Sequence, residues 1–279
     1  MKLREKIGDF TLYVILIVSS IIFLFPFFWM LSTSLKSIQQ VFTYPPVWFP
    51  VPPHWLNYRD ALFSVFPFML YFKNTLIISA GVVIGTLVSC SLTAYGFARL
   101  NFWGKNFLFM VLVSTMMVPL IVRLVPLFLF FKSFGWINTY YPLVVPAFFG
   151  TPFFIFLMRQ FYMSIPEELS DSARIDGCSE FSIWRRIFLP LSKPVMAVVI
   201  IFAFQQTWND FLQPLIFIND DNKKTVILGI YNLIGTGGTE QYWNLVMAVT
   251  VLAVAPVVIL FFAAQKVFVQ GITVTGIKG

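Results

Sequence analysis

Residues suited to polar chemistry are concentrated in one stretch, 164–193, of an otherwise apolar chain. Acidic residues come first, from Glu167 to Asp176, and basic residues follow, including Arg185 and Arg186. Apolar residues recur between them every three to four positions, which is the period of an amphipathic helix. Carboxylates and guanidinium groups arranged in this way suit ion pairing and hydrogen bonding with another protein. The chemistry that this stretch predicts is recognition.

Catalytic chemistry has few residues to draw on. The only histidine is His54, and the two cysteines, Cys90 and Cys178, lie far apart in the sequence. Neither a multi-histidine metal site nor a disulfide framework is expected from them. No segment fits the phosphate-binding pattern G-x-x-x-x-G-K-[ST]. We therefore expect no catalytic residue, no metal and no cofactor in this chain, and no ATP hydrolysis by the chain alone.

The composition is that of an integral membrane protein. Of the 279 residues, 58% are hydrophobic and 11% are charged, and Phe alone occurs 34 times. A soluble domain carries about 25% charged residues, and it could not cover so many aromatic side chains without aggregating. The net charge of +7 comes from bases at the ends of apolar runs, where they report orientation in the lipid bilayer. Nucleic acid is not an expected partner.

Six segments approach the roughly 20 apolar residues that a membrane-spanning helix needs. We expect an all-α membrane protein, with 1–279 as a single transmembrane domain and a first span that is retained rather than cleaved. Pro119 and Pro126 break the third apolar run, which favours a separate helix over Leu124–Phe134 that ends at Gly135. The predicted spans are Phe10–Ser34, Asn74–Ala98, Phe107–Val122, Tyr140–Phe161, Val195–Ile218 and Trp243–Ala264.

The basic residues predict the orientation of these spans. With both termini in the cytoplasm, 12 of the 19 Lys and Arg residues lie on the inner side. Cytoplasmic loops carry such an excess of bases. The even number of spans agrees with termini on one side. The polar stretch 164–193 is then cytoplasmic, where it can reach a soluble partner.

Within this stretch the residue order predicts two short helices. Pro166 suits the first position of the first helix, with Glu167 and Glu168 in its first turn. Gly177 suits a left-handed end to that helix. The second helix has an apolar stripe and ends at Pro190. One interpretation is an amphipathic connector lying on the membrane, and the other is a docking element for a soluble protein. The stripe consists of Phe181, Trp184, Ile187 and Phe188.

The same stretch resembles a family. Ala173-x-x-Asp176-Gly177, nine residues and then Ile187-x-Leu189-Pro190 match the loop E-A-A-x-x-x-G-x9-I-x-L-P of bacterial ABC importer permeases. Asp171-Ser172 replace the Glu-Ala of that motif. The resemblance implies that the loop docks in a cleft of an ATPase subunit, which binds the ATP and Mg. The implied coupling residues are Glu168, Asp171, Ala173, Asp176, Gly177, Ile187, Leu189 and Pro190.

Two more segments narrow the resemblance. The segment Trp208–Leu215 is similar to one found in carbohydrate-importing permeases, and 265–279 is similar to the tail of the smaller maltose-permease-like subunit. In that subunit the tail reaches between the ATPase subunits. The resemblance implies a bacterial inner membrane location, a second homologous permease, an ATP-binding subunit dimer and an extracytoplasmic binding protein. The matching tail residues are Gly271, Thr273, Gly276, Lys278 and Gly279.

The solute and its path stay open at this point. Trp208, Asn209 and Asp210 could line a translocation path, although Asp210 could equally brace a helix beside Pro214, and the aromatic ring could be plain packing. Oligosaccharides of several kinds, uronic-acid oligomers and glycerol phosphate all fit. A gradient-driven secondary transporter and a purely structural subunit are the alternatives from other functional classes.

Overall fold

The computed structural model describes the backbone of residues 2–64, 66–236 and 242–276, and the side chains of 9–64, 66–235 and 242–264. The described residues form helices joined by turns and irregular segments, which confirms the predicted all-α class. The chain divides into two compact units. Unit 1 comprises Met1–Met69 and Gly229–Ala255, and unit 2 comprises Leu70–Leu228 and Pro256–Gly279.

Unit 1 is organised around Asn57. It contains α1 (Lys2–Ser34), α2 (Ile38–Val41) and α3 (Leu56–Phe63), together with parts of the long helices named below. The Asn57 amide donates to the carbonyls of Ser34 and Lys36, each at 2.8 Å, and its carbonyl accepts from Asn244 at 3.0 Å. These bonds fix the chain where it leaves α1. Most apolar side chains of α1 are exposed within the unit, which suits a helix that faces lipid.

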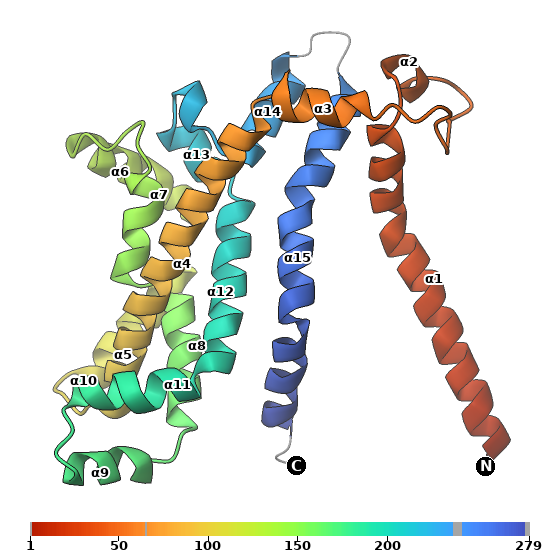
Figure 1. The fold of residues 1–279 in the computed structure, drawn as a ribbon. Coiled ribbons are helices and arrows are strands. Elements are labelled where there is room, and N and C mark those ends of the chain that lie inside the picture. Colours follow the sequence, from red (N-terminus) through yellow and green to blue (C-terminus); the bar gives the residue numbers. More distant parts are fainter. Residues whose placement is uncertain (1, 65, 237–241, 277–279) are drawn as a thin grey trace. The chain divides into compact units, whose positions relative to one another are not determined.

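Unit 2 contains most of the helices (Figure 1), and it also contains the main buried cluster. In it α8 contacts both α5 and α12. The long helices α4, α14 and α15 each extend from one unit into the other. The elements are α4 (Phe68–Arg99), α5 (Lys105–Ser114), η1 (Thr115–Met117), α6 (Leu120–Ser133), α7 (Tyr141–Val144), η2 (Val145–Phe149), α8 (Pro152–Met163), α9 (Glu168–Ile175), α10 (Glu180–Ile183), η3 (Trp184–Phe188), α11 (Leu189–Leu191), α12 (Lys193–Trp208), α13 (Leu212–Phe217), η4 (Asp221–Lys223), α14 (Val226–Thr236) and α15 (Trp243–Gly276).

Among the described residues, four helical segments are long and apolar enough to cross a membrane without a sharp bend, and two bent pairs of helices meet the same test together. Counting each pair as one span gives six, the number that the apolar runs predict, although the second pair begins with Glu180–Leu191, which belongs to the polar stretch 164–193. The four segments are Asp9–Ser34, Phe68–Arg99, Tyr141–Met163 and Trp243–Ala264, and the two pairs are Lys105–Met117 with Leu120–Ser133 and Glu180–Leu191 with Lys193–Trp208.

The third predicted span, Phe107–Val122, is wrong as a straight helix. The chain bends by 101° between Met117 and Leu120. The cause is Pro119, which has no N–H to continue a helix and which holds Val118 in an extended conformation (ψ 112°). The separate helix predicted over Leu124–Phe134 is confirmed as α6, although it begins four residues earlier. It ends before Gly135, whose φ is +68°.

The fifth predicted span, Val195–Ile218, is also interrupted. Helix α12 ends at Trp208, and the chain leaves helical geometry at Asn209 and Asp210 before α13 begins. The Asn209 amide donates back to the carbonyl of Gln205 at 2.9 Å, and Asp210 Oδ1 accepts from the N–H of Gln213 at 3.3 Å. Asn and Asp compete in this way with backbone hydrogen bonding, which favours helix ends.

Small residues let α4 pack closely on the α7–η2 segment. A Cβ at Gly81 would lie 2.7 Å from Val144 Cγ1, and one at Gly85 would lie 2.7 Å from the Phe148 ring. One turn further along, Ser89 Oγ donates to the carbonyl of Ala147 at 2.7 Å. Small residues of this kind permit close helix contact inside membranes.

We predict that Gly81→Ala destabilises the protein by about 1–3 kcal/mol, because the added methyl overpacks the stiff Val144 side chain. Gly96→Ala in the same helix is the control, since nothing lies within 4 Å of its Cβ. There the substitution is neutral or stabilising by up to about 1 kcal/mol. Thermal unfolding of the purified protein measures both. Equal stability of the two variants, or no relief of Gly81→Ala by Val144→Ala, would refute the packing argument.

Candidate docking site

The polar stretch 164–193 folds as two helical segments, as predicted, but with different ends. The first is α9, which starts at Glu168, so Pro166 lies before the helix rather than at its first position. The second runs from Glu180 to Leu191, so Pro190 does not stop it. Its middle, η3, is a π-helix, in which the Leu189 N–H donates to the carbonyl of Trp184. This wider turn lets the helix pass Pro190, which has no N–H of its own.

Gly177 ends α9 in the left-handed conformation, with φ +80°. The Cys178 N–H donates to the carbonyl of Ala173 at 2.9 Å, and the Gly177 N–H donates to that of Arg174 at 3.0 Å. These two bonds form a Schellman motif. They turn the chain sharply from α9 towards α10 and so set the direction in which α9 is presented.

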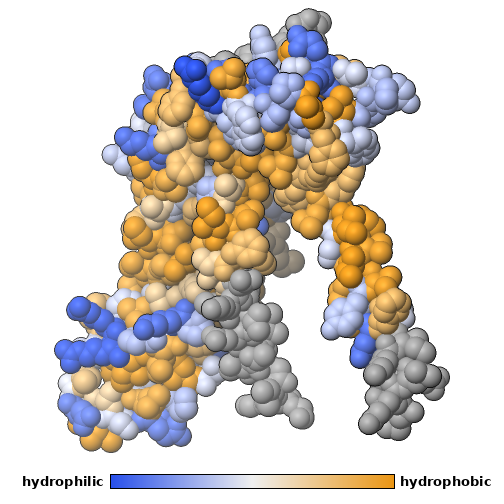
Figure 2. Space-filling view, turned by 45° about the vertical axis from the view of Figure 1, so that its right-hand side comes forward, coloured by the Kyte–Doolittle hydropathy of each residue, from blue (hydrophilic) through white to orange (hydrophobic). Residues whose placement is uncertain are grey.

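One side of α9 is buried and the other is open. Ser170 and Ala173 are buried against the unit, whereas Ile175 is 87% exposed and Leu169 is 44% exposed. Exposed acids accompany these apolar side chains: Glu168, Asp171 and Asp176. Figure 2 shows the hydrophilic residues gathered at this end of unit 2, beside a mostly hydrophobic surface. An apolar centre flanked by charge is the usual composition of a protein interface.

Glu180 ties α9 to the long helix α4. Its Oε2 accepts a hydrogen bond from the Tyr95 hydroxyl at 2.6 Å, and its Oε1 accepts one from Arg174 Nε at 2.8 Å. Arg174 also pairs with Asp171 at 2.7 Å. The two carboxylates raise the pKa of Arg174. Arg174 holds α9 against the start of α10, and Tyr95 holds α10 against α4.

These bonds lower the pKa of the Glu180 carboxyl from its ordinary value near 4.5, chiefly through Arg174 and also through Tyr95. A carboxyl with a lowered pKa stabilises the folded state fully above its ordinary value, and this contribution is lost as the pH falls through the lowered pKa. The attachment of α9 is therefore complete at neutral pH and weakens only in acid.

Arg99 joins the end of α4 to the end of α8. Its guanidinium donates to the carbonyl of Tyr162 at 2.7 Å and also to the carbonyl of Ile165, just before α9. It lies 5.1 Å above the Phe188 ring. Phe188 is fully buried and makes edge contacts with Tyr95 and Tyr162, at 5.0 and 5.4 Å between ring centres. The carbonyls at the end of a helix need such donors.

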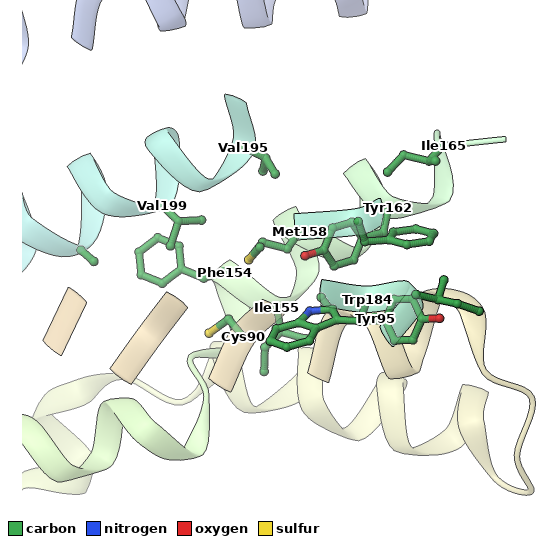
Figure 3. Close-up of a cluster of buried hydrophobic side chains, with 14 of the residues drawn as sticks. Cys90, Tyr95, Phe154, Ile155, Met158, Tyr162, Ile165, Trp184, Val195 and Val199 are labelled. Carbon is green, nitrogen blue, oxygen red and sulfur yellow. The ribbon is translucent and has the colours of Figure 1, made fainter. Parts of the chain in front are cut away.

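One buried cluster extends from the spans into the docking stretch (Figure 3). It combines residues of α4, α8 and α12 with residues on both sides of Gly177. Because interiors pack at crystal-like density, we expect the stretch and the span ends to move together. The cluster comprises Cys90, Ala94, Tyr95, Phe154, Ile155, Met158, Tyr162, Ile165, Ala173, Ile183, Trp184, Phe188, Val195, Val199 and Ala203.

The predicted coupling residues divide into two groups. Ala173 is buried in the cluster, and Ile187 and Leu189 are partly buried against it. The remaining five are exposed: Glu168, Asp171, Asp176, Gly177 and Pro190. The buried residues of the motif therefore attach the stretch to the spans, and its exposed residues form the surface that is open to a partner. Sequence reasoning missed the groups that receive the anchor, Tyr95 and Arg99, whose spacing of four places them on one face of α4.

The predicted tail residues are described only in part. Gly271, Thr273 and Gly276 lie in the helical backbone of α15, and their side chains are outside the described residues. Lys278 and Gly279 lie outside them altogether.

Of the three residues considered for a translocation path, Trp208 is 1% exposed and packs between Phe204 and Phe72, at 5.2 and 5.6 Å between ring centres.

Asn209 is exposed, and Asp210 lines a cavity of about 350 Å³ in unit 2. Asp210 also holds the start of α13 through its bond to Gln213, as the bracing interpretation expects. The polar side chains around the cavity carry hydroxyl, amide and carboxylate groups, and the described lining residues include no base. They are Thr75, Gln206, Thr207, Asp210, Gln213 and Thr225.

Comparison with known proteins identifies the family of this chain. Residues 78–274 match the model of the family described as binding-protein-dependent transport system inner membrane component. The chain belongs to this family. It is 33% identical to the probable ABC transporter permease protein YurM of Bacillus subtilis over all of this chain and 92% of YurM. It is 34% identical to the arabinooligosaccharides transport system permease protein AraQ of B. subtilis, over 93% of this chain and 92% of AraQ.

A solved structure shows the same fold. A chain of a bacterial ABC transporter involved in the import of the acidic polysaccharide alginate superposes with a TM-score of 0.83 and 22% identity, covering 94% of this chain and 96% of that one. As a member of the permease family, the protein is a multi-pass inner-membrane subunit of a binding-protein-dependent ABC importer. The ATPase of such a transporter is a separate subunit, so this permease is not itself an enzyme.

We predict that Glu180→Gln loosens α9 without unfolding the permease, because it removes the charge that Arg174 and Tyr95 share. The loss of about 0.5–1.5 kcal/mol should speed amide hydrogen exchange in 168–178 by about two- to tenfold. Hydrogen exchange with mass spectrometry measures this. Glu167→Gln is the control, since that side chain makes no cap bond to α9. Unchanged exchange in Glu180→Gln would show that α9 is held by other contacts.

Proposed function

We propose that this permease is one of two membrane subunits of an importer for a neutral oligosaccharide, and that 164–193 docks on the ATP-hydrolysing subunit. The observation that carries the docking claim is the exposed face of α9, which is anchored through Glu180 and Arg99 to the ends of the spans. ATP binding by the partner would displace α9, and the shared cluster would pass that displacement to α4, α8 and α12. The spans would then alternate between inward- and outward-facing states.

The orientation follows from this role. Residues 164–193 and both termini are then cytoplasmic, and a binding protein delivers the solute from the other side. The tail residues Gly271, Thr273, Gly276, Lys278 and Gly279 would reach the ATPase on the cytoplasmic side. If the chain were a gradient-driven transporter, the exposed face of α9 would have no partner. If it were a purely structural subunit, substitutions on that face would not change solute uptake.

Two observations favour an oligosaccharide as the solute. AraQ, at 34% identity, is described as a permease for arabinooligosaccharides. The cavity beside Asp210 offers hydroxyl and amide groups, which suit sugar hydroxyls, and a carboxylate, which would repel an anion. Permeases described as transporting sn-glycerol 3-phosphate are also similar, at 29–30% identity over 95% of this chain. A phosphate solute is therefore the second candidate.

We predict that Ile175→Ser lowers coupled transport by about tenfold and leaves the fold intact. Because Ile175 is 87% exposed, its truncation should change stability by no more than about 0.5 kcal/mol. Reconstituted transporter with its ATPase and binding protein gives the readout as solute uptake and solute-stimulated ATP hydrolysis. Normal uptake in a variant of normal stability would end the docking proposal.

Gly177→Ala tests the direction in which α9 is presented. A side chain in the left-handed conformation costs about 1–2 kcal/mol, so the turn should relax and uncouple ATP hydrolysis from uptake. Gly135→Ala is the matched control, because Gly135 has φ +68° and open space around its Cβ but lies after α6. The same uptake defect in both variants would mean that general destabilisation, not lost coupling, is responsible.

The solute assignment has its own test. With the cognate binding protein present, neutral arabino-oligosaccharides should stimulate ATP hydrolysis by the reconstituted transporter, and sn-glycerol 3-phosphate should not. Asp210→Asn keeps hydrogen-bonding capacity and removes the charge, so it should retain most uptake of a neutral sugar. If only sn-glycerol 3-phosphate stimulated ATP hydrolysis, the oligosaccharide assignment would be wrong and the phosphate solute would take its place.

A further inference from the structure

A second cavity, of about 470 Å³, lies between the 98–107 stretch and α8. Its volume falls within the roughly 300–1,000 Å³ range of sites that bind small molecules. Two half-buried cations line it, Lys105 at the start of α5 and Arg159 on α8, together with the amide side chains of Asn101 and Asn106. None of the described lining residues is acidic. The cavity therefore has the chemistry of an anion site.

Both cations are held in place by main-chain carbonyls. Lys105 Nζ donates to the carbonyl of Leu100 at 2.8 Å, and Arg159 Nε donates to that of Phe97 at 3.2 Å. The Arg159 guanidinium also lies over the Phe109 ring, 4.1 Å from its centre. Each contact occupies one donor, whereas an ammonium has three and a guanidinium five. The other N–H groups can bind an oxyanion.

Within the described part of the chain, no carboxylate forms an ion pair with either cation. Glu167 acts on Lys105 electrostatically, but it does not line the cavity. Two cations that share a partly desolvated space without a counter-ion repel each other. An anion bound between them would remove that repulsion.

The start of α5 adds to the same preference. This helix has ten residues, and its N-cap is Gly104, so no side chain caps its first turn. Main-chain N–H groups at a helix N-terminus favour negative charge, most of all the oxygens of a phosphate. Gly104 lines the cavity, as does Phe107 in the first turn of α5.

The position of the cavity favours a membrane lipid as the source of such an anion. It lies at the end of α4 and α8, where Arg99 joins these two spans. The aromatic side chains nearby are open: Trp103 is 99% exposed and Phe107 is 62% exposed. Exposed aromatic residues at the ends of spans suit the membrane–water interface. Basic pockets between spans on the cytoplasmic side bind anionic lipid headgroups.

We propose that this cavity binds the headgroup phosphate of an anionic phospholipid, with Lys105 and Arg159 as its principal ligands. The acyl chains would follow the exposed apolar surface of α5, and Trp103 would lie beside the headgroup. This site is independent of the solute that the permease transports. It rests on the proposed function only for the orientation, which puts this end of α4 and α8 at the cytoplasmic surface of the bilayer.

The test is native mass spectrometry of the complete transporter, released from nanodiscs of neutral phosphatidylcholine that contain graded amounts of phosphatidylglycerol. The double variant Lys105→Gln/Arg159→Gln should retain phosphatidylglycerol about thirtyfold less than wild type, as expected for removing two cations from beside an anionic headgroup. Arg185→Gln/Arg186→Gln is the control, since it removes the same charge from exposed positions at the same end of unit 2. It should retain the lipid as wild type does.

Any of four results would overturn the proposal. Equal retention by wild type and the Lys105/Arg159 variant would show that the cavity holds no lipid. Equal loss in the Arg185/Arg186 control would show non-specific attraction. Displacement of the lipid by inorganic phosphate at equal concentration would show a site for free phosphate. If the Gln variant unfolds, the charge-preserving pair Lys105→Arg/Arg159→Lys should keep the lipid bound, and its loss there would also contradict the assignment.

Discussion

The contacts of the Arg99 guanidinium are the interactions on which the attachment of the stretch 164–193 most depends. The last carbonyls of α8 need donors once the helix ends, and water is scarce around a buried aromatic cluster. Arg99 supplies donors to Tyr162 and Ile165 and rests on Phe188. One side chain thus joins α4, the end of α8 and the π-helix. It therefore fixes the point at which the stretch 164–193 leaves α8.

The consequence for function is mechanical. A docking helix can transmit a movement only if it is attached to the elements that must move. Here the attachment has an apolar part, the cluster that runs from Cys90 to Ala203, and a polar part, the Tyr95–Glu180–Arg174 chain. The polar part fixes direction, and the apolar part resists compression. Together they leave one face of α9 open, which in the proposed mechanism is the face that docks on the ATPase.

Local features of this architecture could be predicted from the sequence, and non-local ones could not. Gly177 and Pro119 act on their own backbone, so the end of α9 and the break before α6 are visible in the chain. The length of each apolar run predicts a span. The interruption at Asn209 is hidden because apolar residues continue on both sides of it. The Tyr95–Glu180 bond joins residues 85 positions apart, and no spacing rule reaches that far. The prediction that Pro190 ends the second helix is wrong because the π-helical turn before it accommodates a residue without an N–H.

The central claim is that α9 and the ends of the spans move as one body. Spin labels at Ser172→Cys, an exposed position on α9, and at Trp103→Cys beside α4, with Cys178 replaced by Ser, would measure the distance between them by double electron–electron resonance in the complete transporter. The account predicts one distance distribution that stays the same in the nucleotide-free and ATP-bound states. A shift of about one helical turn, about 5 Å, would contradict it, because α9 would then move independently of the spans that it is meant to drive.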